Sequence, residues 1–200
     1  MIRKSFYFLS AVLAVLMSNS AQATIVDFEA VAPLYVPQQV ITTNSFHFSN
    51  SFSTLWKFDS DHPYDGESFS GADNQTTFLT FSSFRDTLNI SQIDGSAFNL
   101  TSIDLGLGYF NDSNTASVYL SGHLVGGGVV SQSFEINKSF QTFNPIFTNL
   151  TSLSITSSSD GYLVADNINV SAVPEPTSYA LFMLGIGLIF LTTQRHKNQA

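Results

Sequence analysis

Three carboxylates have the chemistry of a calcium site, and they lie near the two ends of the region formed by residues 24–173. Asp27 and Glu29 lie early in this region, and Asp166 lies near its end in an alternating run. A period of two places Asp166 on the same side of a strand as Val164 and Ile168, where an unpaired charge is costly. Calcium takes oxygen ligands of this kind, so one interpretation of the three residues is a structural calcium site. The alternative is that Asp166 lies at the end of a sheet and accepts hydrogen bonds from backbone N–H groups of a neighbouring turn.

A second acidic cluster spans residues 59–67 and is followed by Asp73. Pro63 and Tyr64 stand at the fifth and sixth places of a loop started at Asp59, where an EF-hand needs an oxygen ligand and a glycine. The cluster is therefore explained better as a solvated acidic loop than as a calcium-binding loop.

Aromatic residues are concentrated in residues 46–84. Trp56 and Tyr64, close to the acidic loop, are candidates for stacking on sugar rings. Most of the others are Phe at strand spacing, and Phe offers an exposed ligand no polar group. Packing in a core explains the majority of these rings, and glycan binding is kept for Trp56 and Tyr64.

Catalytic motifs are missing from the sequence. It has no G-x-S-x-G elbow and no H-E-x-x-H pair. It also has no Cys, which excludes disulfides, thiolate metal sites and cysteine nucleophiles. A carboxylate pair for glycoside hydrolysis can be drawn from any 15 acidic residues, so it carries no weight without geometry. We expect no enzyme activity, and no cofactor beyond the structural calcium; a secreted hydrolase is the least favoured alternative.

The charge balance of the chain argues against a nucleic-acid-binding protein. Seven Lys and Arg against 15 Asp and Glu give a formal net charge of −8. A nucleic-acid-binding protein needs a basic face to neutralise phosphates, and this chain has none to offer. The 19 Phe residues argue equally against a disordered acidic tail, because disorder requires few aromatic residues.

The amino end has the pattern of a secretory signal peptide, residues 1–23. Arg3 and Lys4 precede an apolar run over residues 6–17, and Ala21-Gln22-Ala23 forms a small-x-small cleavage site. The run reaches about 18 Å as a helix, short of the ~30 Å needed to span a bilayer. We expect signal peptidase to cleave after Ala23, so that the mature chain begins at Thr24.

The carboxyl end carries a second hydrophobic segment. Residues 179–193 hold no charge, and Arg195, His196 and Lys197 follow directly. A helix over about residues 177–193 predicts a short membrane anchor whose flanking residues adapt to the bilayer. The basic residues Arg195 and Lys197 would then fix the topology, leaving the body of the protein outside the cytoplasm. The alternative is a buried core helix, which the lack of any polar face disfavours.

Three elements at the carboxyl end occur in the same order as in a known signal. They are the triplet Pro174-Glu175-Pro176, the short hydrophobic helix and the terminal basic cluster. In this combination, residues 174–200 resemble the PEP-CTERM sorting signal of Gram-negative bacteria. The resemblance implies recognition by an exosortase, an inner-membrane enzyme that processes near the triplet. It also implies a transient inner-membrane anchor and final placement at the cell surface or in the extracellular matrix. Substrates of this kind are typically associated with exopolysaccharide and biofilms.

The region between the signals, residues 24–173, predicts an all-β domain. It has almost no helical periodicity, and Gly126-Gly127-Gly128 fits a hairpin turn. Short apolar runs with turn residues between them predict an antiparallel β-sandwich, of jelly-roll type. The segments that open with Asp27 and close with Asp166 are similar to the borders of the β-sandwich common among sorting-signal proteins. The predicted strands cover residues 25–31, 36–42, 45–49, 52–58, 76–82, 97–105, 115–121, 129–136, 139–143, 146–156 and 162–170.

Two functions remain open at this point. The first is an exported, non-catalytic surface or matrix protein that is associated with exopolysaccharide. The second is a carbohydrate-binding module of the cell surface that holds its ligand through Trp56, Tyr64 and the acidic loop. Neither the ligand nor the oligomeric state follows from the sequence.

Overall fold

The computed structural model describes residues 23–29, 34–52, 54–59, 71–82, 86–108, 114–158, 160–173, 185–187 and 189. Thirteen strands account for most of this part of the chain, and all of their pairings are antiparallel. The prediction of an all-β antiparallel sandwich is confirmed. The strands are β1 (Ala23–Val26), β2 (Leu34–Gln38), β3 (Val40–Thr43), β4 (Phe46–Ser49), β5 (Leu55–Asp59), β6 (Thr77–Ser82), β7 (Leu88–Gln92), β8 (Phe98–Leu107), β9 (Thr115–Leu124), β10 (Val129–Asn137), β11 (Gln141–Phe143), β12 (Phe147–Ser157) and β13 (Tyr162–Ala172).

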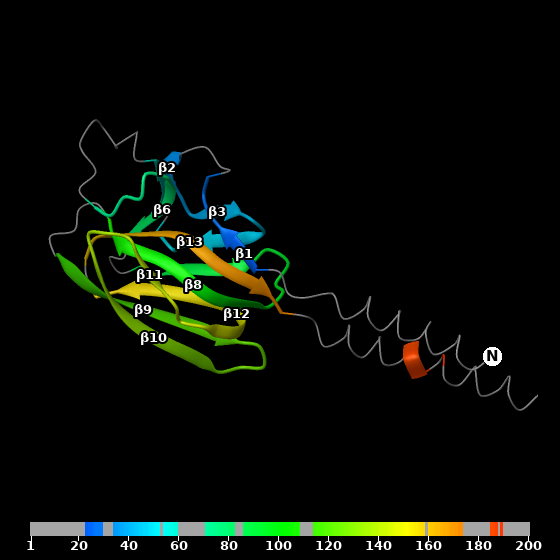
Figure 1. Cartoon of the computed structure of the whole chain (residues 1–200). Coiled ribbons are helices and arrows are strands. Elements are labelled where there is room, and N and C mark those ends of the chain that lie inside the picture. Colours follow the sequence, from blue (N-terminus) through cyan, green and yellow to red (C-terminus); the bar gives the residue numbers. More distant parts are fainter. Residues whose placement is uncertain are drawn as a thin grey trace, which may run out of the picture.

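The sheet folds over on itself into two layers (Figure 1). One layer has the order β2-β5-β6-β13-β8, with β1 added to β13 and β11 added to β8. The other has the order β3-β4-β7-β12-β9-β10. The layers join where β12 pairs with β8, Phe147 opposite Leu100 and Leu150 opposite Phe98. This junction makes one continuous, nearly closed sheet of the two layers.

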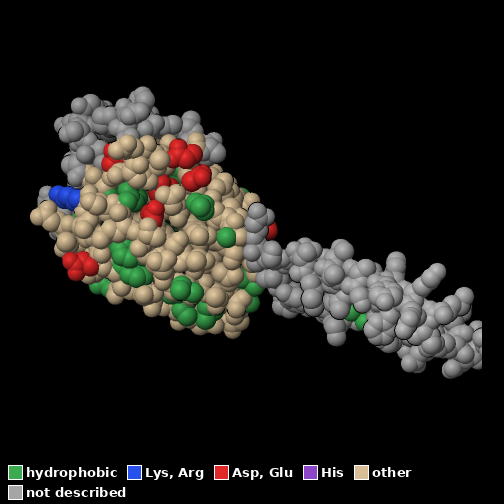
Figure 2. All heavy atoms as spheres, in the orientation of Figure 1, with side chains coloured by type: hydrophobic (Ala, Val, Ile, Leu, Met, Phe, Trp, Pro, Cys, Tyr) green, Lys and Arg blue, Asp and Glu red, His purple; other side chains and the backbone are tan. Residues whose placement is uncertain are grey.

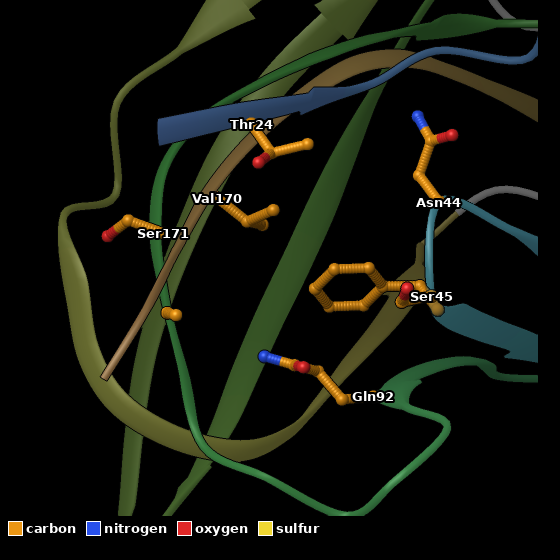
Figure 3. Close-up of a pocket in the computed structure, with 8 residues that line it drawn as sticks. Thr24, Asn44, Ser45, Gln92, Val170 and Ser171 are labelled. Carbon is orange, nitrogen blue, oxygen red and sulfur yellow. The ribbon is translucent and has the colours of Figure 1, made fainter. Parts of the chain in front are cut away.

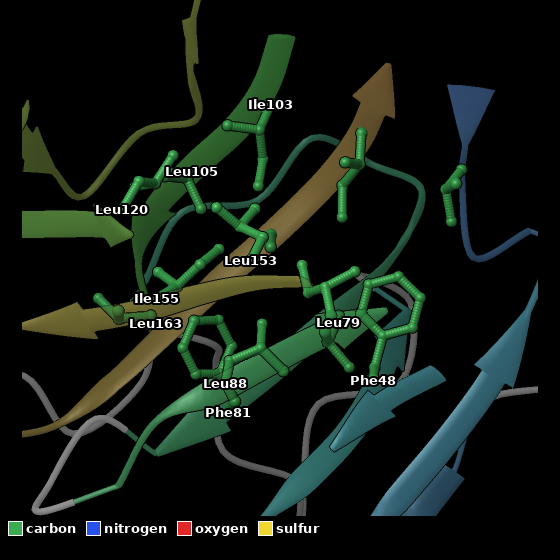
Figure 4. Packing of buried hydrophobic residues seen from close by; sticks show 14 of the residues in the cluster. Phe48, Leu79, Phe81, Leu88, Ile103, Leu105, Leu120, Leu153, Ile155 and Leu163 are labelled. Atoms are coloured by element: carbon green, nitrogen blue, oxygen red, sulfur yellow. The ribbon is translucent and has the colours of Figure 1, made fainter. Parts of the chain in front are cut away.

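The space between the layers is filled by apolar side chains from both (Figure 4). Phe81 and Leu163 come from one layer and Leu120 and Ile155 from the other, and all four are fully buried. Burial of a side chain of this size contributes about 1.5–3 kcal/mol, so a core of this extent supplies the main stabilisation. Alternation along each strand delivers one side chain in two to this core, which is why the sequence runs alternate.

A smaller cluster covers the outer side of the first layer. It consists of Phe58, Ala72, Phe78 and Val164, with Trp56 and Phe140 packed against it. The strands β5, β6 and β13 are therefore covered on both faces, and β6 is buried at five consecutive positions. The cluster explains why these strands are apolar nearly throughout instead of alternating.

The strand boundaries differ from prediction in several places. The expected strand at 25–31 is β1, which ends at Val26, so that Asp27 and Glu29 follow the strand instead of lying in it, and the strand expected at 52–58 begins only at Leu55. The expected strand at 36–42 is two strands, β2 and β3, separated at Gln39. Strand β7 was not predicted, because Asn89 and Ser91 alternate with only two large apolar residues and Asn has low strand propensity. The expected hairpin is confirmed: Gly126, Gly127 and Gly128 all have positive φ between β9 and β10.

Little of the carboxyl-terminal segment is described. Residues 185–187 and 189 are α-helical. Across the part of the chain that the structure covers, no helix has the length and hydrophobicity that a membrane crossing requires. The predicted anchor over 177–193 otherwise falls outside the described residues.

Candidate functional site

Asp166 lies on the outer side of β13, almost fully enclosed at 1% exposure. Its Oδ2 accepts hydrogen bonds from Asn74 Nδ2 at 2.7 Å and from Thr76 Oγ1 at 3.2 Å. Its Oδ1 is buried and has no hydrogen-bond partner in the part of the chain that the structure describes. Burial raises the pKa of this carboxyl above its usual range, the negative charge of Glu29 adds to the rise, and the hydrogen bonds oppose it.

The three carboxylates of the predicted calcium site are not brought together as a set. Glu29 acts electrostatically on Asp166, but its Oε1 accepts a hydrogen bond from the backbone N–H of Thr77 at 2.8 Å. Asp27 follows β1 and is half-buried. In the described ranges, no three His, Asp or Glu side chains are grouped so that they could hold a metal ion. Asn74 and Thr76, which contact Asp166 here, were not among the predicted ligands, since they lie about ninety positions away in sequence.

Trp56 takes part in the smaller aromatic cluster. Its ring lies nearly parallel to that of Phe58, with centroids 6.4 Å apart, and meets the edge of Tyr162 at 5.1 Å. The side chain is half-buried by these contacts. These contacts support the alternative interpretation, in which Trp56 packs within the domain. Its partner in the glycan hypothesis, Tyr64, lies outside the described residues.

The outer face of the second layer is lined with hydroxyl and amide groups. One row crosses all six strands through directly paired residues: Val40, Ser49, Asn89, Ser154, Ser121 and Ser131. At ~4.8 Å between strands the row extends about 24 Å. We call this surface the hydroxyl face; besides that row it comprises Thr42, His47, Ser91, Ser117, Tyr119, His123, Val129, Ser133, Glu135, Ser152 and Thr156.

The polar groups on the hydroxyl face bind one another. Ser154 Oγ donates to Asn89 Oδ1 at 2.8 Å, and the hydroxyls of Ser121 and Ser131 are 3.3 Å apart. These short side chains keep the face shallow, and each hydroxyl can still donate or accept. The ring of Tyr119, 46% exposed, stands among them. It is the aromatic residue of this face.

Charge is almost excluded from the hydroxyl face. Of its described residues, Glu135 is the sole Asp, Glu, Lys or Arg. An ordinary solvated face carries about a quarter to a third of such residues. Figure 2, which views the domain as in Figure 1, shows most of the visible Asp and Glu side chains in the upper half of the domain. The acidic character of the chain is thus concentrated elsewhere. The alternation of Ser117, Tyr119 and Ser121 hinted at a polar side of one strand, but the pairing of six strands was needed to reveal a surface.

A cavity of about 420 Å³ lies where β1 begins and β13 ends. Figure 3 shows Thr24, Asn44, Gln92 and Ser171 around it. Its amides are occupied within the domain: Asn44 Nδ2 donates to the Ile25 carbonyl at 3.2 Å, and Gln92 accepts a bond from Ser96 at 2.8 Å. These contacts hold the strand ends in place.

The predicted processing residues lie at these ends. Ala23 and Thr24 are the first residues of β1, both exposed, and pair with Ser171 and Val170 of β13. The Val173 N–H still donates to the Ala97 carbonyl at 3.3 Å. The remaining predicted positions fall outside the described residues: Ala21, Pro174, Glu175, Pro176, Arg195 and Lys197.

Solved structures similar to the domain have low sequence identity to it. The CBM22-1–GH10 modules of xylanase 10B from Clostridium thermocellum, complexed with xylohexaose, match over 76% of this chain and 29% of that one, at 12% identity and a TM-score of 0.42. A family 11 carbohydrate-binding module of a cellulosomal cellulase from the same organism matches over 78% and 98%, at 9% identity and a TM-score of 0.36. The CBM22-1 xylan-binding domain of Paenibacillus barcinonensis Xyn10C matches over 78% and 99%, at 9% and 0.37.

No curated protein matches the chain at a significant level. A family model does match its carboxyl-terminal part, over residues 172–195. The match begins on the last residue of β13 and includes the Pro-Glu-Pro triplet and Arg195. The chain therefore carries a PEP-CTERM protein-sorting motif, which implies an exported cell-surface protein that an exosortase processes.

Proposed function

We propose that this protein is a non-catalytic component of the cell surface or extracellular matrix that binds uncharged polysaccharide through its hydroxyl face. The sorting motif supports the location, and the hydroxyl face supports the binding. The β-sandwich domain would carry the binding function, and the two terminal segments would direct export and sorting.

The route to the surface uses both ends of the chain. Signal peptidase would remove residues 1–23, and the segment after Pro176 would hold the protein briefly in the inner membrane. Arg195 and Lys197 would fix its orientation until the exosortase acts near the triplet. The domain would then be residues 24–173, in a matrix that is built around exopolysaccharide.

We predict that the exported protein begins at Thr24. Ala21-Gln22-Ala23 supplies the small-x-small site, and cleavage there removes only the first residue of β1. Amino-terminal sequencing of the surface fraction tests this. Recovery of chains that retain Met1 would contradict it.

Binding of an uncharged polymer is supported by the chemistry of the hydroxyl face. Sugar hydroxyls donate and accept hydrogen bonds, as do Ser and Thr hydroxyls, and Asn offers an amide that does both. Tyr119 adds an exposed ring with a polar end. An acidic polymer is disfavoured because the chain carries a net charge of −8 and the face holds no cation.

Tyr119→Ala is expected to weaken binding to an uncharged exopolysaccharide about fivefold to tenfold, because the ring contributes stacking area beyond its hydrogen bond. Affinity electrophoresis against a panel of neutral and acidic polysaccharides measures the effect. Phe52→Ala is the matched control, since Phe52 is 64% exposed but lies off the hydroxyl face. Equal weakening in both variants, or binding to the acidic polymers alone, would contradict the proposal.

The absence of catalysis is part of the proposal. Asp166 has the environment of a tuned acid, with a raised pKa, yet at 1% exposure no polysaccharide reaches it. Glycoside hydrolysis requires two carboxyl groups that flank the bond to be cut. The burial of Asp166 therefore supports a structural role for this residue.

Structural calcium remains a proposal with Asp166 and Glu29 as its carboxylates, since the predicted set of three that includes Asp27 is not grouped in the described part of the chain. The buried, unpartnered Oδ1 of Asp166 is the observation that supports it. Excess chelator is expected to lower the melting temperature by several degrees, because a ligand that binds only the folded state stabilises it by mass action. A melting curve that chelator leaves unchanged would reject the site.

A further inference from the structure

Strand β10 forms one margin of the second layer (Figure 1). Within the described residues it pairs with β9 and with no other strand, over nine registered positions from Val129 to Asn137 without a bulge. Five of the nine residues are exposed, Ser131 and Ser133 among them. Among the described residues, no second strand is hydrogen-bonded to the outer edge of β10, although part of the strand lies close to β8.

The backbone groups at this outer edge can be identified from the hairpin. The Leu124 N–H donates to the Gly128 carbonyl at 3.1 Å, so Leu124 points its hydrogen bonds toward β10. Antiparallel strands alternate the direction of these groups residue by residue. The N–H and C=O groups of Val129, Ser131, Ser133, Glu135 and Asn137 consequently point away from β9.

The margins β2 and β3 have features that discourage pairing, most of which β10 lacks. Strand β2 contains Pro37, which has no N–H, and its register with β5 is irregular. Strand β3 has four residues. Proline, bulges, short length and charge are the means by which sheets avoid edge-to-edge association. Over its nine residues β10 has no Pro, Lys or Arg, and one charge, at Glu135.

We propose that β10 pairs with β10 of a second copy of this chain, antiparallel, about a two-fold axis at Ser133. Ser133 would face Ser133 of the other copy, Ser131 would face Glu135, and Val129 would face Asn137. Every outward N–H and C=O group of β10 would then find a partner, which is the driving force for strand addition.

The register avoids the one repulsion that self-pairing risks. Each Glu135 meets a serine rather than the other Glu135, so like charges are not opposed across the junction. The hydroxyl faces of both copies lie on the same side and become one surface, since Ser131, Ser133 and Glu135 belong to that face. A second copy is thereby favoured as the occupant over an unrelated strand. This inference does not depend on what the face binds.

A single cysteine placed on the proposed axis tests the pairing. The chain has no Cys, so Ser133→Cys creates the sole thiol. Residues of a hydrogen-bonded antiparallel pair have Cα atoms about 5.5 Å apart, within the range of a disulfide. Mild oxidation of membranes that hold the full-length variant is expected to convert most of it into a covalent dimer on a non-reducing gel.

Ser131→Cys is the matched control. In the proposed register the two Ser131 residues lie four positions apart along the strands, about 14 Å, which is too far for a disulfide. Dimer from Ser133→Cys but not from Ser131→Cys supports the register. Equal cross-linking of the two, no dimer from Ser133→Cys, or cross-linking of Ser133→Cys to a different protein overturns the proposal.

Charge substitutions in the Ser133→Cys background separate pairing from misfolding. Ser131→Lys places a cation opposite Glu135 of the other copy and is expected to raise the rate of cross-linking at least about twofold. Adding Glu135→Lys to this variant places Lys opposite Lys. The rate of cross-linking is then expected to fall at least about twofold below that of Ser133→Cys alone. Rates that do not follow this order overturn the proposal, because both variants carry the same substitution at residue 131.

Discussion

Replacement of Pro174, Glu175 and Pro176 by alanine is expected to leave export intact and to abolish processing, so that the uncleaved protein accumulates in the inner membrane. The prolines hold the chain extended and disfavour a helix just before them, which keeps Glu175 accessible to a membrane-embedded enzyme. Three alanines favour continuation of a helix instead. Fractionation, with mass measurement of the mature form in a host that has the exosortase, measures the result.

The matched control for this experiment is the pair Thr177→Ala and Ser178→Ala, which changes the next two residues and keeps the triplet. This variant is expected to be processed as the natural sequence is. Normal release and an unchanged mature mass of the triple-alanine protein would show that the triplet is only a linker. Loss of export itself would point to misfolding before sorting.

Lys57→Met is expected to stabilise the domain by about 1–3 kcal/mol at neutral pH. Lys57 is fully buried in β5, between Leu34 of β2 and Leu79 of β6 in register, and its Nζ has no hydrogen-bond partner among the described residues. Methionine fills similar space without a charge. Thermal melts of the exported protein should rise by about 2–4 °C for each kcal/mol.

The gain from Lys57→Met should depend on pH. Burial lowers the pKa of the Lys57 ammonium from its usual value of 10.5. The cost of the charge is thus complete below the folded-state pKa and disappears as pH rises past the unfolded-state value. Lys138→Met, at an exposed position, is the control and should change stability by less than about 0.5 kcal/mol. A lower melting temperature for Lys57→Met would contradict the unpaired charge.

Alternation within single strands was enough to predict the class of fold, but not what covers each face. In Leu55-Trp56-Lys57-Phe58 the period of two puts Leu55 and Lys57 on one side. Nothing local shows that both sides are covered: that depends on the distant Tyr162, which packs on Trp56. The same distance explains why Trp56 was a reasonable glycan candidate by sequence and is a packed residue in the fold.

The predicted carboxylate site was incomplete for a related reason. The costly position of Asp166 was predictable, because a period of two places it on the same side of the strand as Val164, which packs in the outer cluster. The same expectation was wrong for Ile168: the register with β8 shifts after Asp166, and Ile168 lies in the main core. The hydrogen-bond partners of Asp166 are Asn74 and Thr76, which come from the segment that precedes β6, and only tertiary structure brings them to β13. The hydroxyl face is a still clearer case, since it exists only once six strands are in register.

The position of β13 has a mechanical consequence for a protein held by its carboxyl end. The sorting motif starts on the last residue of β13, and β13 has neighbours on both sides, β8 on one and β6 and β1 on the other. Tension from a carboxyl-terminal tether would therefore enter the centre of the sheet. Because the ladder bonds lie perpendicular to the strand, tension directed along β13 would load many of them in shear at the same time. A domain tethered in this way would pass the load from β13 to the strands on both of its sides, β8, β6 and β1.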